Sequence, residues 1–390
     1  MKISSNALSV KFFALLGYAI FSLAAVAVFA EIVSWAGWSV YRRTHPEPHR
    51  NEAASPAFTG DAWAPEFWRE ESARVQVKKE YVPFRLWGVM PWHGKYINND
   101  ESEMGVWRRT INPSSNQCTG KHTVNIWMFG GSAVYGARVP DWATLPSQLS
   151  RDLNSAGKDC VVVSNFGVEG YTSNQELISL VEQLKAGRHP SLVIFYDGIN
   201  DSATADPPHG PLRAHYSYEL IRSRIEGSLR QRFLDVVRQS YSVRTVGMAL
   251  SAIHRRRDST VAVSDSKEQA ATVLDNYVEN LQVVRALGKA YGFRTRCFWQ
   301  PSLYFGQKPL VLFEQTETDA LGKDPRDATI RAAYEEADQR SMRSQDFVFL
   351  GHVFDSVPDP IYIDQVHLGP KGNELVAHAL ADYLKSNADL

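Results

Sequence analysis

The sequence predicts an α/β protein in which helices cover both faces of a parallel sheet, preceded by one apolar helix. From about residue 124 onward, short apolar runs that end at glycine, proline or polar residues alternate with amphipathic helical patterns. This alternation is typical of parallel strands joined by crossover helices, which form three layers. At 390 residues, with 44% hydrophobic and 22% charged residues, the chain can build one large or two modest domains.

Charge and cysteine content exclude some classes of function. The formal net charge is −1, so the sequence offers no broad basic surface, and no nucleic-acid partner is expected. The three cysteines, Cys118, Cys160 and Cys297, are too few and too far apart for a zinc site. No metal ion and no cofactor is expected.

Residues 12–30 form an apolar run without a formal charge. At about 1.5 Å per residue of helix, this run is long enough to cross a bilayer core. A cleaved signal peptide is the alternative, because the residues from Val28 to Glu31 resemble a small-residue cleavage site. The run is longer than a typical signal-peptide core, so we predict an uncleaved membrane anchor, residues 1–30. The flanking basic residues do not fix its orientation.

Residues 31–115 are predicted to form a stalk followed by an aromatic-rich extension. The stretch to about residue 80 is polar and shows no sustained period. Beyond it, aromatic residues recur among glycine and proline, which favours short strands or ordered loops over a helix: Trp87, Trp92, Tyr96 and Trp107. These rings either offer a stacking platform for a sugar or cap the apolar edge of the main sheet, and we favour the second interpretation.

The main domain, residues 116–390, begins with a strand that leads to a serine. From Ile126, four apolar residues are followed by two glycines and Ser132, which predicts a buried strand and a tight turn that exposes the serine hydroxyl. Leucines four residues apart in 144–153 predict the first crossover helix. A second strand, 161–166, then ends at Gly167.

The next helix and strand continue the alternation. Ser173 and Glu176 form a capping box that opens a helix with apolar residues on one face. A third buried strand, 191–196, delivers the loop from Asp197 to Asp201. Three strands joined by helices imply parallel order and right-handed crossovers.

An insertion, residues 202–266, interrupts this alternation. Within it, 220–237 form a basic amphipathic helix, whose polar face is solvated by default; a lid or a membrane-surface contact is the alternative. A long helix, 271–290, and a fourth strand, 293–299, then restore the pattern.

The last block lies near the C-terminus, after a charged helix and a short strand, 347–350. Asp364 and His367 are three residues apart and precede Gly369-Pro370, which fit the start of a closing helix. A short turn at this spacing can bring the Asp364 carboxylate and the His367 ring together.

Taken together and in this order, four blocks resemble those of the SGNH (GDSL-type) serine hydrolases: Gly130-Gly131-Ser132, Asn165-Phe166-Gly167, Asp197 to Asp201, and Asp364 to His367. The resemblance covers about Val124 to Lys385 and implies a three-layer domain with a flavodoxin-like parallel sheet. Gly131 stands where the name-giving motif has aspartate, a departure that leaves the nucleophile intact. Active sites of such sheets open at the carboxyl ends of the strands, where all four blocks fall.

The resemblance implies a role for each block residue. A serine hydroxyl needs a neighbouring imidazole to remove its proton, and that imidazole works best when a carboxylate holds it. Ser132, His367 and Asp364 fill these three roles. The oxyanion donors are then the Ser132 N–H, the Gly167 N–H and the Asn200 side-chain amide. Three further residues lie beside the blocks and are left outside the catalytic set: Tyr171, Asp201 and Gln300.

The resemblance and the apolar N-terminal run together imply an O-acyl esterase with an exported catalytic domain. Its expected substrate is an acylated carbohydrate, with O-acetyl groups of an envelope or secreted polysaccharide favoured. An acyltransferase with the same triad is one alternative, and a non-catalytic glycan-binding or scaffold component is another. Lipid or thioester hydrolysis stays open, and no protein partner is predicted.

One disulfide is predicted from the strand order. Cys118 lies shortly before the strand that leads to Ser132, and Cys160 lies directly before the strand that ends at Gly167. In the doubly wound order these strands are parallel neighbours, so both cysteines fall at the amino edge of the sheet, within reach of a disulfide. Two unpaired buried cysteines are the alternative. Cys297 lies inside the fourth strand and is interpreted as a buried small apolar residue.

Overall fold

The structure is a computed structural model, which describes residues 4–44, 52–77, 79–155, 158–205, 215–227, 237, 240–254, 263–322, 324 and 326–387. Its contacts divide the chain into two compact units. One unit comprises Met1–Arg50 and Glu219–Thr260, and the other comprises Asn51–Tyr218 and Val261–Leu390. The aromatic-rich extension thus belongs to the same unit as the main sheet.

The larger unit is built on a five-stranded parallel sheet in the order β5-β4-β6-β7-β8. Its strands are β4 (Thr123–Gly130), β5 (Cys160–Gly167), β6 (Leu192–Asp197), β7 (Arg294–Trp299) and β8 (Val348–Phe349). The chain starts in the second position and reverses direction across the sheet, which is the flavodoxin-like doubly wound order. The predicted fold class is therefore confirmed.

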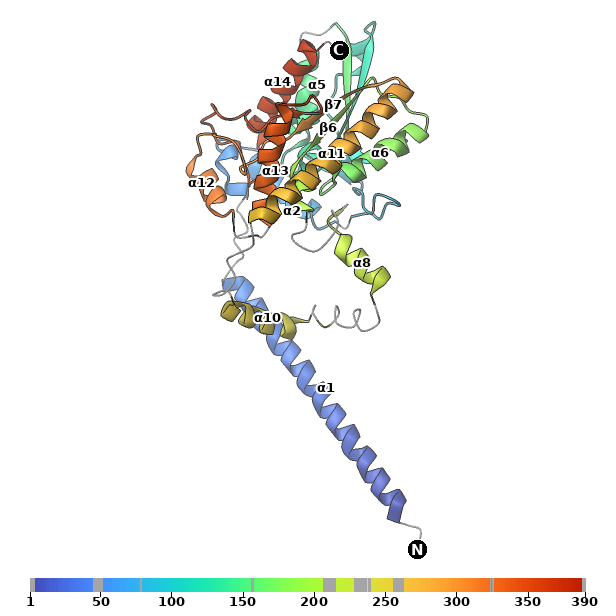
Figure 1. Ribbon diagram of the computed structural model, residues 1–390, viewed down its shortest axis with the longest axis vertical. Coiled ribbons are helices and arrows are strands. Elements are labelled where there is room, and N and C mark those ends of the chain that lie inside the picture. Colours follow the sequence, from blue (N-terminus) through green and yellow to red (C-terminus); the bar gives the residue numbers. More distant parts are fainter. Residues whose placement is uncertain are drawn as a thin grey trace. The chain divides into compact units, whose positions relative to one another are not determined.

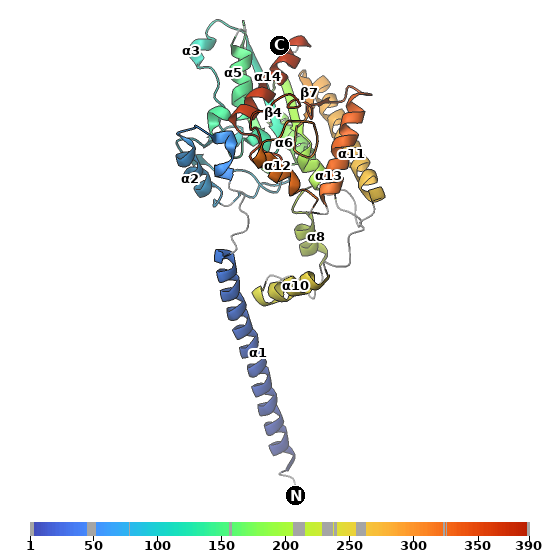
Figure 2. The same ribbon diagram turned by 90° about the vertical axis from the view of Figure 1, so that its left-hand side faces the viewer.

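Helices cover both faces of this sheet (Figures 1 and 2). One face carries α6 (Ser173–Lys185), α11 (Val263–Tyr291) and α13 (Arg326–Ser341), and the other carries α5 (Leu145–Asn154) and α14 (Pro370–Ser386). Successive residues of a strand point to opposite faces. In β4, Trp127 and Phe129 join the first core, whereas Ile126 and Met128 join the second.

The aromatic-rich extension contains a small antiparallel sheet of β1 (Trp92–His93), β2 (Asn98–Ser102) and β3 (Gly105–Arg108). The helix α2 (Ala64–Arg74) precedes it, in the stretch that was predicted to be stalk without regular structure, so that prediction is wrong there. The predicted short strands are confirmed. The Trp107 ring lies against Phe166 of β5, with ring centroids 4.7 Å apart, and Trp107 is buried in the first core. This tryptophan therefore covers the edge strand of the main sheet, as the favoured interpretation expects.

Short elements complete the larger unit: η1 (Glu52–Ala54), η2 (Pro56–Phe58), α3 (Ser115–Cys118), α4 (Ser132–Tyr135), η3 (Asp141–Ala143), α7 (Ile199–Ala203) and α12 (Leu312–Asp319). The predicted capping box of α6 is wrong. Thr172 is the N-cap residue, and the Ser173 N–H lies 3.3 Å from both carboxylate oxygens of Asp201. A carboxylate from α7 therefore takes the place that a local Glu176 side chain was expected to fill.

The smaller unit contains α1 (Ser4–Thr44), α10 (Tyr241–His254) and most of α8 (Tyr218–Glu226). The apolar segment Phe12–Tyr41 of α1 is long and apolar enough to cross a membrane. Residues 31–44, which were predicted as stalk, continue this helix because no proline interrupts them and apolar residues recur to Tyr41. Residues 228–236 of the predicted helix 220–237 lie outside the described residues.

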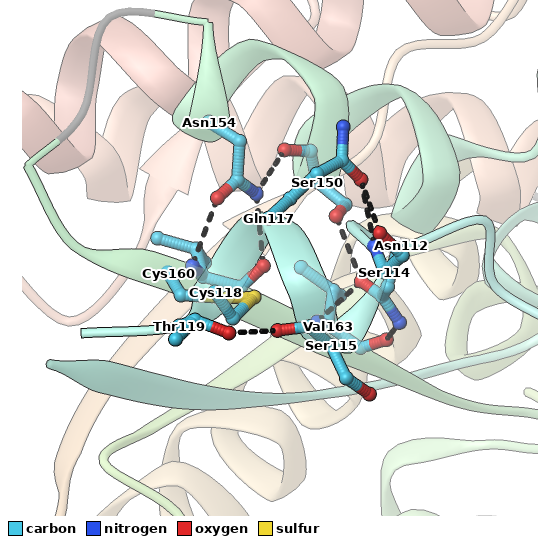
Figure 3. The surroundings of a disulfide bond; sticks show 11 residues. Asn112, Ser114, Ser115, Gln117, Cys118, Thr119, Ser150, Asn154, Cys160 and Val163 are labelled. Carbon is cyan, nitrogen blue, oxygen red and sulfur yellow. Dashed lines mark hydrogen bonds between the residues drawn. A yellow bond between two sulfur atoms is a disulfide. The ribbon is translucent and has the colours of Figure 1, made fainter. Parts of the chain in front are cut away.

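The predicted disulfide is present. Cys118 and Cys160 are bonded, with their Cα atoms 5.2 Å apart, at the amino edge of the sheet (Figure 3). The Asn112 side chain stands beside them and binds both the N–H and the C=O of Val163, each at 2.9 Å. Cys297 is buried in β7, as predicted, and burial raises the pKa of its thiol to about 12.

Candidate active site

Ser132 is the first residue of a short helix that begins directly after β4. β4 ends at Gly130, Gly131 is the N-cap residue, and α4 follows without an intervening loop. A Cβ atom on Gly131 would collide with the side-chain nitrogen of Asn200. The tight turn therefore places the serine hydroxyl at the carboxyl edge of the sheet, and a larger residue at position 131 would displace the Asn200 side chain.

The three residues expected to form the triad lie in hydrogen-bond contact. His367 Nε2 is 2.8 Å from Ser132 Oγ, and His367 Nδ1 is 2.7 Å from Asp364 Oδ2. The second carboxylate oxygen of Asp364 accepts the N–H groups of Val366 and His367, each at 2.8 Å. These two backbone bonds fix the carboxylate, which in turn fixes the ring.

Asp364 is buried yet stays ionised. Burial opposes its ionisation, but the neighbouring His367 and then Arg138 outweigh burial and hold the pKa of the carboxyl far below its ordinary value. Arg138 Nη1 lies 3.4 Å from each ring nitrogen of His367, and its Nε donates to Glu52 at 2.6 Å. The sequence analysis missed this arginine, which lies outside the recognised blocks; its backbone φ is +69°.

Asn200 lies beside Gly131, in α7 shortly after β6. Its Nδ2 donates to the backbone oxygen of Tyr171 at 2.7 Å, and its Oδ1 accepts the Tyr216 hydroxyl at 3.1 Å. Two bonds therefore fix the amide plane. An amide nitrogen carries two hydrogens, so the bond to Tyr171 leaves one N–H of Asn200, on a nitrogen that lies beside Gly131.

The expected role of Gly167 is not supported by the structure. Its N–H donates to Asn165 Oδ1 at 2.9 Å, so this donor is already engaged. Asn165 also donates to the backbone oxygen of Val134 at 2.8 Å. A Cβ atom on Gly167 would collide with the backbone of Tyr135. Gly167 thus allows α4 to pack closely against β5, and Asn165 ties the two elements together.

Gly170, three residues further on, fits the role of an oxyanion donor better than Gly167 does. Its φ is +80°, a conformation that favours glycine. It directly precedes Tyr171, whose carbonyl binds Asn200. Within the part of the chain that the structure describes, neither the Gly170 N–H nor the Ser132 N–H has a hydrogen-bond acceptor. Gly170 lies three residues beyond the block Asn165-Phe166-Gly167, and sequence spacing alone did not show which of these two glycines adopts positive φ.

The three residues left outside the catalytic set have structural partners. Asp201 Oδ1 accepts the Ser173 hydroxyl at 2.6 Å, and burial raises the pKa of Asp201 to about 6. The Tyr171 hydroxyl donates to the backbone oxygen of Trp87. The Gln300 N–H donates to the backbone oxygen of Asp197 at 2.7 Å. Among the described residues, no group of three or more acidic, histidine or cysteine side chains is arranged to hold a metal ion.

A serine at the carboxyl edge of a parallel sheet, bonded to a histidine that a carboxylate holds, defines the class of serine hydrolases. Residues 126–380 match the family model of the GDSL-like lipases/acylhydrolases, and the chain belongs to this family. It is therefore an SGNH-type serine ester hydrolase.

Solved structures that are similar to this chain have low sequence identity to it. One is a lipolytic protein of the G-D-S-L family from Veillonella parvula, with 12% identity and a TM-score of 0.34, over 67% of this chain and 98% of that one. Another is a catalytic mutant of an acetylxylan esterase from Geobacillus stearothermophilus, with 14% identity and a TM-score of 0.35, over 68% and 93% of the two chains. No curated protein matches the chain.

Proposed function

We propose that this esterase removes acetyl or other short acyl groups from an envelope or secreted polysaccharide, with Ser132, His367 and Asp364 as its triad. The observation that carries the proposal is the unbroken run of hydrogen bonds from Asp364 through His367 to Ser132, inside the segment that matches the acylhydrolase family. Asp364 keeps His367 in the tautomer whose Nε2 can accept a proton.

In the acylation step, Ser132 Oγ attacks the ester carbonyl carbon and His367 Nε2 takes the serine proton. The tetrahedral intermediate collapses when the C–O bond to the sugar breaks, and His367 returns the proton to the leaving alkoxide. A water molecule then attacks the acyl-serine with His367 as base. This second step releases the carboxylic acid and restores the Ser132 hydroxyl.

The oxyanion of each tetrahedral intermediate requires donors that are already in place. We assign this role to the N–H groups of Ser132 and Gly170 and to the side-chain amide of Asn200. The N–H groups of Ser132 and Gly170, which have no acceptor among the described residues, and the fixed amide plane of Asn200 support this set. Gly170 replaces Gly167 in the set because the Gly167 N–H is bound by Asn165.

The preference for a short acyl group is carried over from the family resemblance. A cavity of about 130 Å³ lies beside the loop that follows β5, with Arg74, Trp92, Asn99 and Glu169 among its lining residues. Ser132, His367 and Asn200 do not line this cavity, so its volume does not set the size of the acyl group.

The location of the substrate rests on the N-terminal helix. An uncleaved anchor that holds an exported catalytic domain would give the enzyme access to envelope or secreted glycans. The apolar segment Phe12–Tyr41 supports the membrane part of this proposal. The carbohydrate part is carried over from the family resemblance and the expected export.

The test is a substrate series with the full-length protein in detergent or nanodiscs. Hydrolysis of 4-nitrophenyl esters should fall as the acyl chain lengthens from acetate to octanoate, and O-acetylated glycans should release acetate. Ser132→Ala should remove nearly all turnover, whereas Ser72→Ala, at an exposed serine of α2, should not. Equal rates for wild type and Ser132→Ala would contradict the triad. Faster transfer to an added sugar than to water would favour an acyltransferase.

A further inference from the structure

A carboxylate at the end of the apolar run of α1 binds the first turn of α10. Glu31 Oε1 accepts the Tyr241 N–H at 2.6 Å, and Glu31 Oε2 accepts the Ser242 N–H at 3.0 Å and its hydroxyl at 2.8 Å. The first N–H groups of a helix have no partner within it, and the helix dipole favours a negative charge there. Glu31 therefore caps α10 from a different helix.

A second bond lies two turns further along α1. The Trp38 indole N–H donates to Thr245 Oγ1 at 3.2 Å. Glu31 and Trp38 are seven residues apart, so they lie on the same face of α1. Tyr241 and Thr245 are four residues, or about one turn, apart in α10, so they also lie on one face of their helix. The two contacts therefore fix α10 across the C-terminal part of α1, as Figure 1 shows within this unit.

The position of Glu31 along α1 determines how deep in the membrane the contact between α1 and α10 lies. At about 1.5 Å per residue, 12–30 span about 28 Å, close to the thickness of a bilayer core. Glu31 is the next residue, and Trp35, Trp38 and Tyr41 follow it. Tryptophan and tyrosine are enriched at the level of the lipid headgroups. The capped end of α10 thus falls at headgroup level when α1 spans a membrane.

The composition of α10 suits this level. The helix contains no acidic residue. Its side chains Val243 and Val246 are 37% and 58% exposed, and Arg244 lies between them in the sequence. In the sequence, Arg255 to Arg257 follow directly. Apolar residues combined with basic residues and no acid are typical of helices that lie in the membrane interface.

We propose that α10 is an interfacial helix that lies in the headgroup layer of the membrane spanned by α1 and is held there by Glu31. The inserted segment thereby gives the protein a second membrane contact. The exposed apolar side chains of α10 then contact the outer end of the lipid acyl chains. This inference rests on the proposed membrane anchor and is independent of the proposed esterase activity.

The test measures the depth of spin labels on the full-length protein in nanodiscs with anionic lipid. Single labels are placed by Val246→Cys on α10, Val26→Cys on α1 and Val283→Cys on α11, all at exposed positions. Cys297 is buried and does not compete for the label. Collisions with oxygen report lipid, and collisions with a water-soluble nickel chelate report solvent.

The labels at 246 and 26 should collide more often with oxygen than with the nickel chelate. The label at 283 should collide more often with the nickel chelate. If the label at 246 collides mainly with nickel (a water signature) while the label at 26 collides mainly with oxygen (a lipid signature), the proposal of an interfacial helix is wrong and the membrane anchor stands. Water signatures at both positions would overturn the anchor as well.

The role of Glu31 is tested with the same label at 246. Glu31→Ala should lose the lipid signature or strongly mobilise the label, and Glu31→Gln, which keeps an acceptor oxygen, should lose less. The label at 26 serves as the control and should not change. An unchanged label at 246 in Glu31→Ala would show that Glu31 does not hold the helix.

Discussion

At the scale of single residues, the site depends on which hydrogen-bonding groups are already engaged. Asp364 uses one oxygen for His367 and the other for two backbone N–H groups. Asn200 has both ends of its amide fixed, and the Gly167 N–H is bound by Asn165. The hydrogen-bond donors that are not engaged in this way are the ones that a bound substrate can use.

Asp364→Asn should lower kcat by about 10⁴, a loss of the size seen when an asparagine replaces the aspartate of a serine-protease triad. The asparagine amide would donate to His367 Nδ1 and so favour the tautomer whose Nε2 carries the proton. Ester hydrolysis measures the loss, and circular dichroism checks that the fold persists. A variant that is folded and nearly as active as wild type would remove Asp364 from the triad.

The assignment of Gly170 is tested by replacing one backbone amide with an ester, which deletes the N–H and adds no side chain. The ester at residue 170 should lower kcat by roughly 10²–10³, as the loss of one oxyanion donor does. The matched ester at residue 167 removes only the bond to Asn165. It should cost stability of about 1 kcal/mol and little rate. The reverse pattern would return Gly167 to the oxyanion site.

Sequence spacing predicted the three side chains of the proposed triad, because their chemical types are restrictive and their blocks follow strand ends. The structure brings Ser132, Asp364 and His367 into one hydrogen-bonded group. Spacing did not predict Gly170 or Arg138. A backbone N–H is present at every residue except proline, so its role depends on φ and on bonds already made. Arg138 reaches the site from a turn that no motif marks.

At the scale of elements, strand order was the most predictable feature. The five apolar runs became the five parallel strands, and the order placed Cys118 and Cys160 close enough to bond. Elements whose partners are distant in sequence were less predictable, and α2 formed within the stretch that was expected to be stalk. The N-terminus of α6 is bound by Asp201 of α7, and α1 continues beyond Glu31, where that residue binds α10.

The disulfide should stabilise the larger unit without affecting catalysis. It closes a loop with a sequence separation of 42 residues. By loop entropy, such a bond contributes about 4 kcal/mol to the free energy of unfolding. The double variant Cys118→Ser/Cys160→Ser should therefore unfold at lower urea concentration with an unchanged kcat, because Ser132 lies at the opposite edge of the sheet. A large loss of kcat in the folded variant would contradict this separation of roles.

At the scale of the whole molecule, buried acids beneath the site make stability depend on pH. Burial raises the pKa of Asp201 to about 6, and it raises the pKa values of Glu176 and Asp197 as well. Between about pH 4 and 6 the folded chain keeps a proton on Asp201 that the unfolded chain has released. The contribution of Asp201 to stability therefore falls as the pH rises through this window.

Asp201→Asn cannot ionise, so its stability relative to wild type should improve by up to about 3 kcal/mol between pH 4 and pH 7. Urea unfolding at a series of pH values measures the difference. Asp382→Asn, at an exposed aspartate of α14, is the control and should show no comparable trend. If Asp201→Asn lost stability relative to wild type as the pH rose, the carboxylate would be stabilising in its charged form.

The most direct measurement of the catalytic group is the site at which a fluorophosphonate attaches. This reagent forms a stable bond only with a serine oxygen that a neighbouring base activates. Peptide mapping by mass spectrometry should find one equivalent on Ser132, none in Ser132→Ala, and much slower attachment in His367→Ala. Attachment to another serine, or an equal rate in His367→Ala, would contradict the triad of Ser132, His367 and Asp364.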